Sequence, residues 1–262
     1  MKENKIKFHN LINNYKFIDT HTHIIKEYYE NPVEIIKKII TNMRYLILPG
    51  TEIQDSLEVI QTSKHFDNVF ALVGIHPNNV KNNNILYLKN INPNDVIGVG
   101  EVGYDFHYFS KEETFNLQKM IFEKHILWAQ KYNKLVFIHS RESDKESYEM
   151  VKKYPDVTFI FHSYNQPLKM TKKYLNLKNI YFSLSGMITF KNSNDLRKSV
   201  LNIPLNRILL ETDTPYLTPF PMRGNTNITE YVSFTYVFFA KLKNISLKFL
   251  ILQVEENFER IL

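Results

Sequence analysis

Short apolar segments separated by polar or turn-forming residues recur along the whole chain, and they predict its strands. Such short apolar runs between polar or turn-forming residues are typical of buried strands. The segments are 17–18, 45–48, 69–75, 96–99, 135–138, 158–161, 180–184 and 208–210. The pattern therefore predicts eight strands.

Longer segments with helical spacing or charge fill the intervals between these runs. They are 32–41, 53–66, 85–89, 112–132, 143–154, 167–174 and 195–201. Strand and helix thus alternate, which indicates a parallel sheet with helices outside it. Closure of eight such units into a TIM-type (β/α)₈ barrel is the commonest arrangement, and an open doubly wound sheet is the alternative.

The length of the chain agrees with one barrel. Its 262 residues match the roughly 250 that an α/β barrel uses as a single domain. No Ser/Gly/Pro linker, internal repeat or low-complexity tract divides it. We expect a single domain over 1–262, in which two amphipathic helices within 228–262 pack on the outside and cover the eighth strand.

Composition narrows the possible chemistry. The chain contains no cysteine, which excludes disulfides, zinc–thiolate sites, iron–sulfur clusters and cysteine nucleophiles. Any metal ion must therefore be held by nitrogen and oxygen. The net charge of +6 suits a polyanionic partner, but the cations are scattered, as at Lys37, Lys81 and Lys172, which favours solvated helix faces.

Targeting signals are not recognisable in the sequence. Residues 1–16 are basic but lack the apolar run of about 7–15 residues that a signal peptide needs. The apolar stretch 231–239 is much shorter than the ~20 residues that span a bilayer. We expect a cytoplasmic protein without a membrane partner, and no protein partner can be inferred.

The first predicted strand leads into Asp19-Thr20-His21-Thr22-His23. Alternation along a strand sends residues 19, 21 and 23 to one face. The two imidazoles are then close enough to bind one divalent ion at about 2.0–2.1 Å each. A pair of surface histidines is the alternative for this motif taken alone.

Further histidines and acids follow other predicted strands directly. Glu101 follows 96–99, His139 follows 135–138, His162 follows 158–161, and Asp213 lies just after 208–210. The carboxyl ends of barrel strands form one face, where active sites are built. Independent structural roles for all of these side chains would be a large coincidence.

These positions predict a metal centre. We expect His21, His23, Glu101, His139, His162 and Asp213 to hold one or two divalent ions, with Glu101 and Asp213 as catalytic residues. A carboxylate such as Glu101 has two oxygens that can bridge two ions, and Asp213 is the candidate general base. Nitrogen-rich ligation favours zinc, manganese or iron, and magnesium stays open. Two ions ~3.5–4 Å apart activate water in phosphoesterases.

Other residues near the same face have weaker assignments. His76, Arg141 and Arg223 are candidate substrate contacts, with structural roles or surface salt bridges as alternatives. Asp19 and Asp105 are expected to support the ligands from behind. Near the expected mouth, three aromatic residues are candidates to contact a base: Tyr104, Phe106 and Tyr216.

Four motifs in order carry a family resemblance: Asp-x-His-x-His at 19–23, Gly-Ile-His-Pro at 74–77, Gly-Glu-Val-Gly-x-Asp at 100–105 and Glu-Thr-Asp-x-Pro-Tyr at 211–216. Together with Arg223-Gly224, Asn227 and Asn257-Phe258, they resemble TatD-type metal-dependent hydrolases. The resemblance implies a TIM-type barrel, a cytoplasmic location and deoxyribonuclease activity at DNA ends. It also implies two metal sites, one of His21, His23, Glu101 and Asp213, the other of Glu101, His139 and His162.

Two segments depart from the family pattern. Ser163-Tyr164-Asn165-Gln166 replaces a small glycine-containing turn, and Ile228-Thr229 stands where the family often has Glu-Pro. The leading hypothesis is a divalent-metal-dependent deoxyribonuclease acting on single-stranded or frayed DNA ends. The alternatives are a metal-dependent ester or amide hydrolase, such as an aminoacyl-tRNA deacylase, and a non-catalytic nucleic-acid-binding protein.

Overall fold

The computed structural model describes residues 15–262, so the basic segment before Tyr15, including His9, lies outside the described residues. Eight strands form one sheet in chain order, and every neighbouring pair is parallel. The strands are β1 Phe17–Asp19, β2 Met43–Leu48, β3 Val69–Val73, β4 Gly98–Asp105, β5 Leu135–Arg141, β6 Phe159–Phe161, β7 Ile180–Leu184 and β8 Ile208–Leu210.

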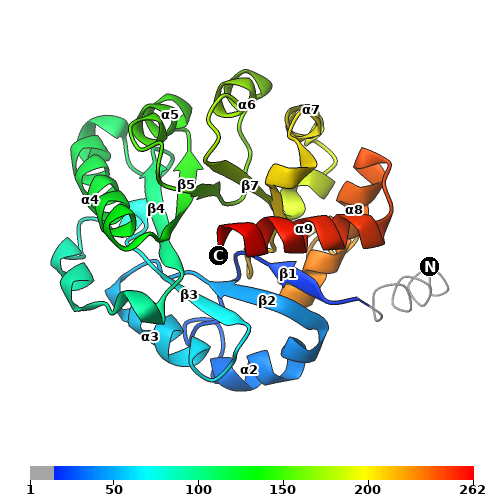
Figure 1. Cartoon of the computed structure of the whole chain (residues 1–262), viewed down its shortest axis with the longest axis horizontal. Coiled ribbons are helices and arrows are strands. Elements are labelled where there is room, and N and C mark those ends of the chain that lie inside the picture. Colours follow the sequence, from blue (N-terminus) through cyan, green and yellow to red (C-terminus); the bar gives the residue numbers. More distant parts are fainter. Residues whose placement is uncertain (1–14) are drawn as a thin grey trace.

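The sheet curls into a barrel with the helices around it (Figure 1). Just past the strand ends, the Thr20 amide donates to the Leu210 carbonyl at 3.1 Å, and Thr22 and Thr214 form a parallel bridge. The barrel prediction is therefore confirmed, and the open sheet is excluded. Because all strands run the same way, their carboxyl ends share one face of the barrel.

Helices surround the strands, and most begin within two residues of the predicted positions. They are α2 Pro32–Ile39, α3 Ile53–Ser63, α4 Lys111–Tyr132, α5 Asp144–Lys152, α6 Leu168–Tyr174, α7 Asn194–Leu201, α8 Val232–Lys243 and α9 Leu247–Ile261. In α4, Ser110 and Glu113 form a capping box that fixes the first turn. The segment predicted as a helix at 85–89 is a 3₁₀ helix, Ile85–Asn90.

The fourth strand is longer than its apolar pattern predicts. The apolar run covers 96–99, whereas β4 continues to Asp105 and is buried throughout. Glu101 consequently lies within the strand and not after it. The polar residues of β4 are stabilised by groups inside the barrel mouth, so apolar periodicity alone could not show where the strand ends.

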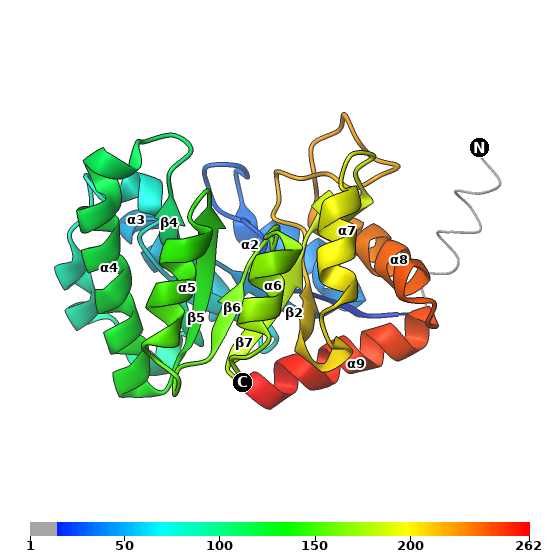
Figure 2. The ribbon, with the colours of Figure 1, turned by 90° about the horizontal axis from the view of Figure 1, so that it is seen from above.

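The two C-terminal helices take different positions. Helix α8 packs outside the barrel against β1 and β8, as predicted. Helix α9 instead runs across the end of the barrel opposite the long β8–α8 connection (Figure 2). Asn257 on α9 is fully buried there, and its Nδ2 donates to the carbonyls of Leu205 at 2.7 Å and Ile208 at 2.8 Å. Asn257 thereby connects α9 to the start of β8.

Packing of the outer layer corrects one prediction about the mouth. Tyr104 is buried between β4 and α4, where its ring packs on Phe115 and Phe122. Phe106 contacts the same group of rings. Neither side chain lines the pocket, because β4 alternates and sends these residues toward α4. Within 15–262, no helix is long and apolar enough to cross a membrane.

Removing the amide of Asn257 is expected to weaken the fold. In Asn257→Ala, two buried carbonyls lose their donor, which should lower the free energy of unfolding by about 2–4 kcal/mol. Chemical denaturation monitored by circular dichroism measures this change. The control Glu256→Ala changes an exposed neighbour on α9 and should shift stability by less than about 0.5 kcal/mol. Equal stability of both variants would contradict the structural role of Asn257.

Candidate active site

Glu101 stands at the centre of the barrel mouth, and its two carboxylate oxygens face different groups of histidines. Oε2 lies 3.3 Å from Nε2 of His21 and 3.4 Å from Nε2 of His23. Oε1 lies 2.8 Å from Nε2 of His162 and 3.0 Å from Nδ1 of His139. One carboxylate therefore connects two separate sets of nitrogen donors.

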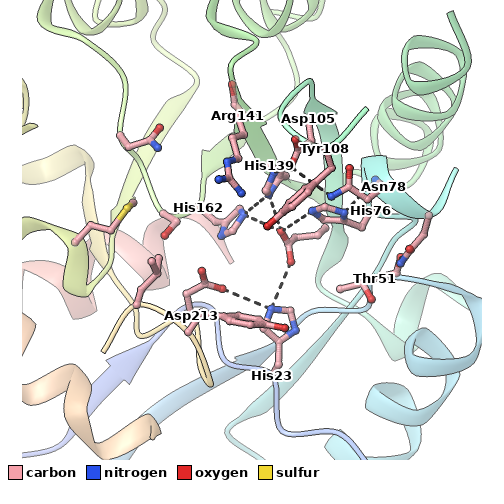
Figure 3. Close-up of a pocket in the computed structure, with 18 of the residues that line it drawn as sticks. His23, Thr51, His76, Asn78, Asp105, Tyr108, His139, Arg141, His162 and Asp213 are labelled. Atoms are coloured by element: carbon pink, nitrogen blue, oxygen red, sulfur yellow. Dashed lines mark hydrogen bonds and ion pairs between the residues drawn. The ribbon is translucent and has the colours of Figure 1, made fainter. Parts of the chain in front are cut away.

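The set on the Oε2 side also includes Asp213. Its Oδ1 lies 3.6 Å from Nε2 of His23 and 3.8 Å from Nε2 of His21. The Asp213 amide donates to the His21 carbonyl at 2.9 Å, so the segment after β8 lies against the segment after β1. Figure 3 shows His23 and Asp213 together on one side of the pocket.

The set on the Oε1 side brings two imidazoles into direct contact. Nδ1 of His139 lies 3.1 Å from Nε2 of His162, and both nitrogens face the same Glu101 oxygen. Two nitrogens at this distance need a proton or a cation between them. The group His21, His23 and Glu101 and the group Glu101, His139 and His162 each place their ligand atoms within 4.8 Å of one another.

Two glycines let Glu101 come this close. A Cβ on Gly74 would meet the backbone nitrogen of Glu101 at 2.6 Å. A Cβ on Gly103 would lie 2.0 Å from the carbonyl oxygen of His139, and the φ of Gly103 is +142°. Both positions require glycine because β4 passes its neighbouring strands without room for a side chain.

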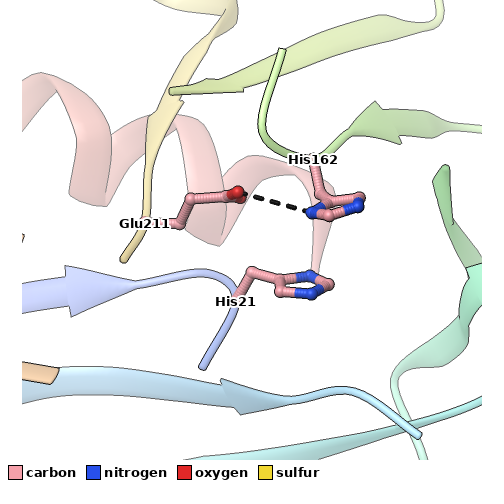
Figure 4. A group of neighbouring side chains, drawn as sticks. All are labelled: His21, His162 and Glu211. Carbon is pink, nitrogen blue, oxygen red and sulfur yellow. Dashed lines mark ion pairs between the residues drawn. The ribbon is translucent and has the colours of Figure 1, made fainter. Parts of the chain in front are cut away.

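Further acids hold the imidazoles from behind. Asp105 accepts from Nε2 of His139 at 3.0 Å, which directs Nδ1 of that ring toward Glu101. Glu211 lies on the other side, where its Oε1 is 3.5 Å from Nδ1 of His162 (Figure 4). Such outer contacts fix the orientation and tautomer of a ligating imidazole.

Asp19 connects the first and last strands. Its carboxylate accepts from the Thr212 amide at 2.9 Å and from the Thr212 hydroxyl at 2.5 Å, and it is fully buried. It also accepts from the His21 amide at 3.2 Å. Asp19 therefore supports the His21 and Asp213 segments without facing the pocket, and burial raises its pKa well above the ordinary value.

Charges in the site are strongly coupled. Although burial opposes ionisation of Glu101, the charges of His162 and His21 hold its pKa well below the ordinary value. Burial also opposes a charge on His23, yet hydrogen bonds that its ring donates to Asp213 and Glu101 raise its pKa to about 10. The site around His23, Glu101 and Asp213 therefore favours positive charge.

His76 reaches the same carboxylate from β3. Its Nε2 lies 3.6 Å from Oε1 of Glu101, and its Nδ1 accepts from the Asn78 amide at 3.1 Å. Burial and the neighbouring His139 lower the pKa of His76 to about 3, so the ring is neutral. With Nδ1 as an acceptor, the proton resides on Nε2, which is directed toward the site.

The two predicted arginines differ in position. Arg141 lines the pocket, where its guanidinium lies 5.1 Å from the ring centre of Tyr108. Arg223 does not line it: its guanidinium lies 4.0 Å from the ring centre of Phe190 and donates to the Thr218 carbonyl. The structure therefore brings Arg141, but not Arg223, to the site.

The sequence pattern did not indicate three residues of the site: Tyr28 and Tyr108, which line the pocket, and Glu211, which is buried behind His162. Glu211 lies within the Glu-Thr-Asp motif, and its place two residues before Asp213 was the signal that could have revealed it. Tyr28 and Tyr108 lie in the connections after β1 and β4, which carry no periodic pattern. Their position depends on loop conformation and could not be read from spacing.

The departures from the family pattern do not obstruct the pocket. In 163–166, Tyr164 and Gln166 are each 2% exposed, and Tyr164 packs beneath the turn against Phe182. Ser163 has a positive φ of 43°, and its amide donates to Oε1 of Glu211 at 2.6 Å. Thr229, in the second departure, contacts the segment that carries His21 and His23: its hydroxyl lies 2.9 Å from that of Thr22.

The donor set fits a divalent metal ion. Nδ1 of His21, Nδ1 of His162 and one oxygen of Glu211 are buried without a hydrogen-bond partner among the described residues. His21, His162 and Glu211 form a further group of their own, with ligand atoms within 4.8 Å of one another. The nitrogens and oxygens on each side of Glu101 are equally close, and imidazole with carboxylate is a ligand set that zinc and manganese accept. The six predicted ligands would hold such ions.

Comparison with known proteins identifies the family. The profile described as "TatD related DNase" matches residues 18–262. The chain belongs to the TatD family. An uncharacterized metal-dependent hydrolase of Mycoplasma genitalium is 34% identical over 252 residues, which cover 88% of this chain and 93% of that protein. An uncharacterized metal-dependent hydrolase of Buchnera aphidicola is 31% identical over 247 residues, which cover 88% of this chain and 92% of that protein.

Solved structures show the same fold. The TatD homologue YjjV of Escherichia coli superposes with a TM-score of 0.81 at 21% identity, covering 92% of this chain and 95% of that one. A TatD-family hydrolase of Entamoeba histolytica superposes with a TM-score of 0.76 at 18% identity, covering 94% of this chain and 98% of that one. This TatD-family chain is therefore a metal-dependent hydrolase on a TIM-type barrel.

Neutralising Glu211 is expected to weaken metal binding. In Glu211→Gln, His162 loses the charged partner that orients its ring, so metal affinity should fall by roughly 10- to 100-fold while the fold is kept. Titration of the metal-stripped protein against a competing chelator measures the affinity. Glu230→Gln changes an exposed acid and serves as the matched control. Unchanged affinity in Glu211→Gln would show that this acid does not support the metal centre.

Proposed function

We propose that this TatD-family hydrolase is a deoxyribonuclease that releases nucleotides from single-stranded or frayed DNA ends. The division of Glu101 between two sets of histidines carries the proposal, because a carboxylate that serves two cation sites is the arrangement of two-metal phosphoesterases. The family description and the net charge of +6 also support a polyanionic substrate.

The proposed ligand sets follow the two groups of donors. His21, His23, Glu101 and Asp213 would hold one ion, and Glu101, His139 and His162 the other. Divalent ions bound there would supply an acidified water and neutralise charge on phosphoryl oxygens. Zinc, manganese and magnesium are the candidate ions, and the nitrogen-rich donor set favours the first two.

Asp213 has the position and charge of a general base. Its side chain is 13% exposed and lines the pocket, so a water molecule in the pocket can reach it. Although burial raises its pKa, the bond to His23 and the neighbouring histidines lower it below the ordinary value. The carboxylate is therefore ionised at neutral pH and can accept a proton from an attacking water.

We assign two further side chains, His76 and Arg141, to contacts with phosphate. Nε2 of His76 is a neutral donor beside Glu101, and the Arg141 guanidinium lies at the same side of the pocket (Figure 3). Arginine presents a planar fork of donors that matches phosphate oxygens. The pocket has a volume of about 640 Å³, within the usual range for ligand sites.

Release of nucleotides from end-labelled single-stranded DNA tests the proposal. The metal-stripped protein should be inactive, and magnesium, manganese or zinc should restore release. Asp213→Asn should lower kcat by about 100-fold or more, because it removes the proposed base and one ligand. Asp67→Asn, which changes an exposed acid, is the matched control and should retain full activity.

The same assay separates the alternatives. If wild type and Asp213→Asn release no nucleotide with any of the three metals, DNA is not the substrate. If the wild type, although inactive on DNA, deacylates aminoacyl-tRNA in a metal-dependent way, the protein is an ester hydrolase. Salt-dependent, metal-independent binding without turnover would instead identify a non-catalytic nucleic-acid-binding protein.

A further inference from the structure

Two exposed tyrosines lie in the pocket on either side of the metal centre. Tyr108 follows β4 and is 67% exposed, and Tyr216 follows β8 and is 54% exposed. Both rings line the pocket, and each remains more than half exposed. Large aromatic groups exposed inside a polar pocket are typical of ligand contacts.

Tyr108 and Arg141 form one aromatic and cationic surface. The Arg141 guanidinium lies 5.1 Å from the centre of the Tyr108 ring and so covers one face of it. The neighbouring His107 contacts the residue after β5: its Nδ1 lies 2.6 Å from Oε1 of Glu142. Figure 3 shows Tyr108 and Arg141 beside His139 and His162, opposite His23 and Asp213. The His107 ring meets the Tyr108 ring edge to face with centres 4.9 Å apart, and Tyr108 is nevertheless 67% exposed.

Arg141 has unused donors. Among residues 15–262 no carboxylate forms an ion pair with its guanidinium, in contrast to Arg44 and Arg260. A cation that stacks on a ring keeps its N–H groups directed outward in the plane of the guanidinium. Arg141 can therefore stack on Tyr108 and still donate to a phosphate.

Tyr216 is fixed on the opposite side. Its hydroxyl lies 2.8 Å from that of Tyr28, and the two rings meet edge to face with centres 6.2 Å apart. The Tyr216 amide donates to the Asp213 carbonyl at 2.9 Å, and its own carbonyl accepts from Nδ2 of Asn227 at 2.5 Å. The ring therefore has a set position relative to the proposed base.

We propose that Tyr108 and Tyr216 each stack on a nucleobase, one on either side of the scissile phosphate, and that Arg141 binds a neighbouring phosphate. This inference rests on the proposed function, and it names the residues that would select the DNA substrate. A tyrosine ring stacks on any base without reading its identity, so the contact is tolerant of sequence. A base inside a duplex must first leave its stack, which costs free energy. These residues thus make the site selective for unpaired strands.

The test compares a short oligothymidylate with the same strand carrying abasic tetrahydrofuran residues in place of its bases. Fluorescence anisotropy with the metal-stripped protein measures binding of both strands without cleavage. The wild type should bind the base-bearing strand more tightly. Tyr108→Ala and Tyr216→Ala should each weaken that binding by roughly 5- to 150-fold, and should leave binding of the abasic strand unchanged.

Conservative and distant variants make this result specific. Tyr108→Phe and Tyr216→Phe keep the ring and should restore the preference for bases. Tyr132→Ala removes a tyrosine that lies at the end of α4, does not line the pocket, and should bind both strands like wild type. Equal loss for both strands in the two alanine variants would show a structural role and overturn the stacking assignment.

Arg141 has a separate signature. Arg141→Gln should weaken the base-bearing and abasic strands equally, and should reduce the slope of log affinity against log salt by about 0.7, the value for one phosphate contact on a single strand. An unchanged slope of log affinity against log salt would show that Arg141 does not contact a phosphate.

Cleavage is measured apart from binding, so the two proposals can fail separately. A wild type that prefers base-bearing strands but cuts none with any metal would support the stacking assignment and contradict the nuclease. A wild type that cuts both strands and binds them equally would support the phosphodiesterase and overturn the stacking assignment.

Discussion

The structure depends on keeping a carboxylate charged at the centre of the barrel mouth. Glu101 is only 4% exposed, and removing a charge from water costs several kcal/mol unless partners replace the solvent. Imidazoles from β5 and from the segments after β1 and β6 supply those partners at 2.8–3.4 Å. The arrangement requires closure of the barrel, because its donors come from strands far apart in the sequence. The site can therefore form only when the barrel is closed.

Successive shells of contacts hold that arrangement. Asp105 and Glu211 orient His139 and His162, and Asp19 fixes the segment that carries Asp213. Farther out, Asn257 connects α9 to the start of β8, whose other end leads to Glu211 and Asp213. A helix at the opposite end of the barrel thus helps to set the position of groups in the mouth. Rigid support of this kind keeps ligands within the narrow geometry that a metal site requires.

The mouth combines this rigid centre with more exposed loops. The proposed metal ligands lie in the strands or just after them, whereas Tyr28, Tyr108 and Tyr216 come from the connections that follow the strands. Loop residues can vary without disturbing the strands, which is how one barrel serves many substrates. We therefore assign the hydrolytic chemistry to the strand ends and the choice of substrate to the loops. In the unusual turn at 163–166 the two large side chains, Tyr164 and Gln166, are buried, and only Ser163 and Asn165 line the pocket.

The sequence by itself determined the order of strands and helices and the six central donors. Apolar runs identify buried strands, and parallel strands bring their carboxyl ends to one face, so a residue just past each run has a predictable place. The tertiary structure alone decided what depends on contacts distant in sequence. It extended β4 through Glu101, divided the Glu101 oxygens between two sets of histidines, and placed Glu211 behind His162. It also stacked Arg223 on Phe190 and Arg141 on Tyr108. Periodicity records which face a residue occupies, whereas loop conformation and side-chain direction are set by neighbours that only the closed barrel brings together.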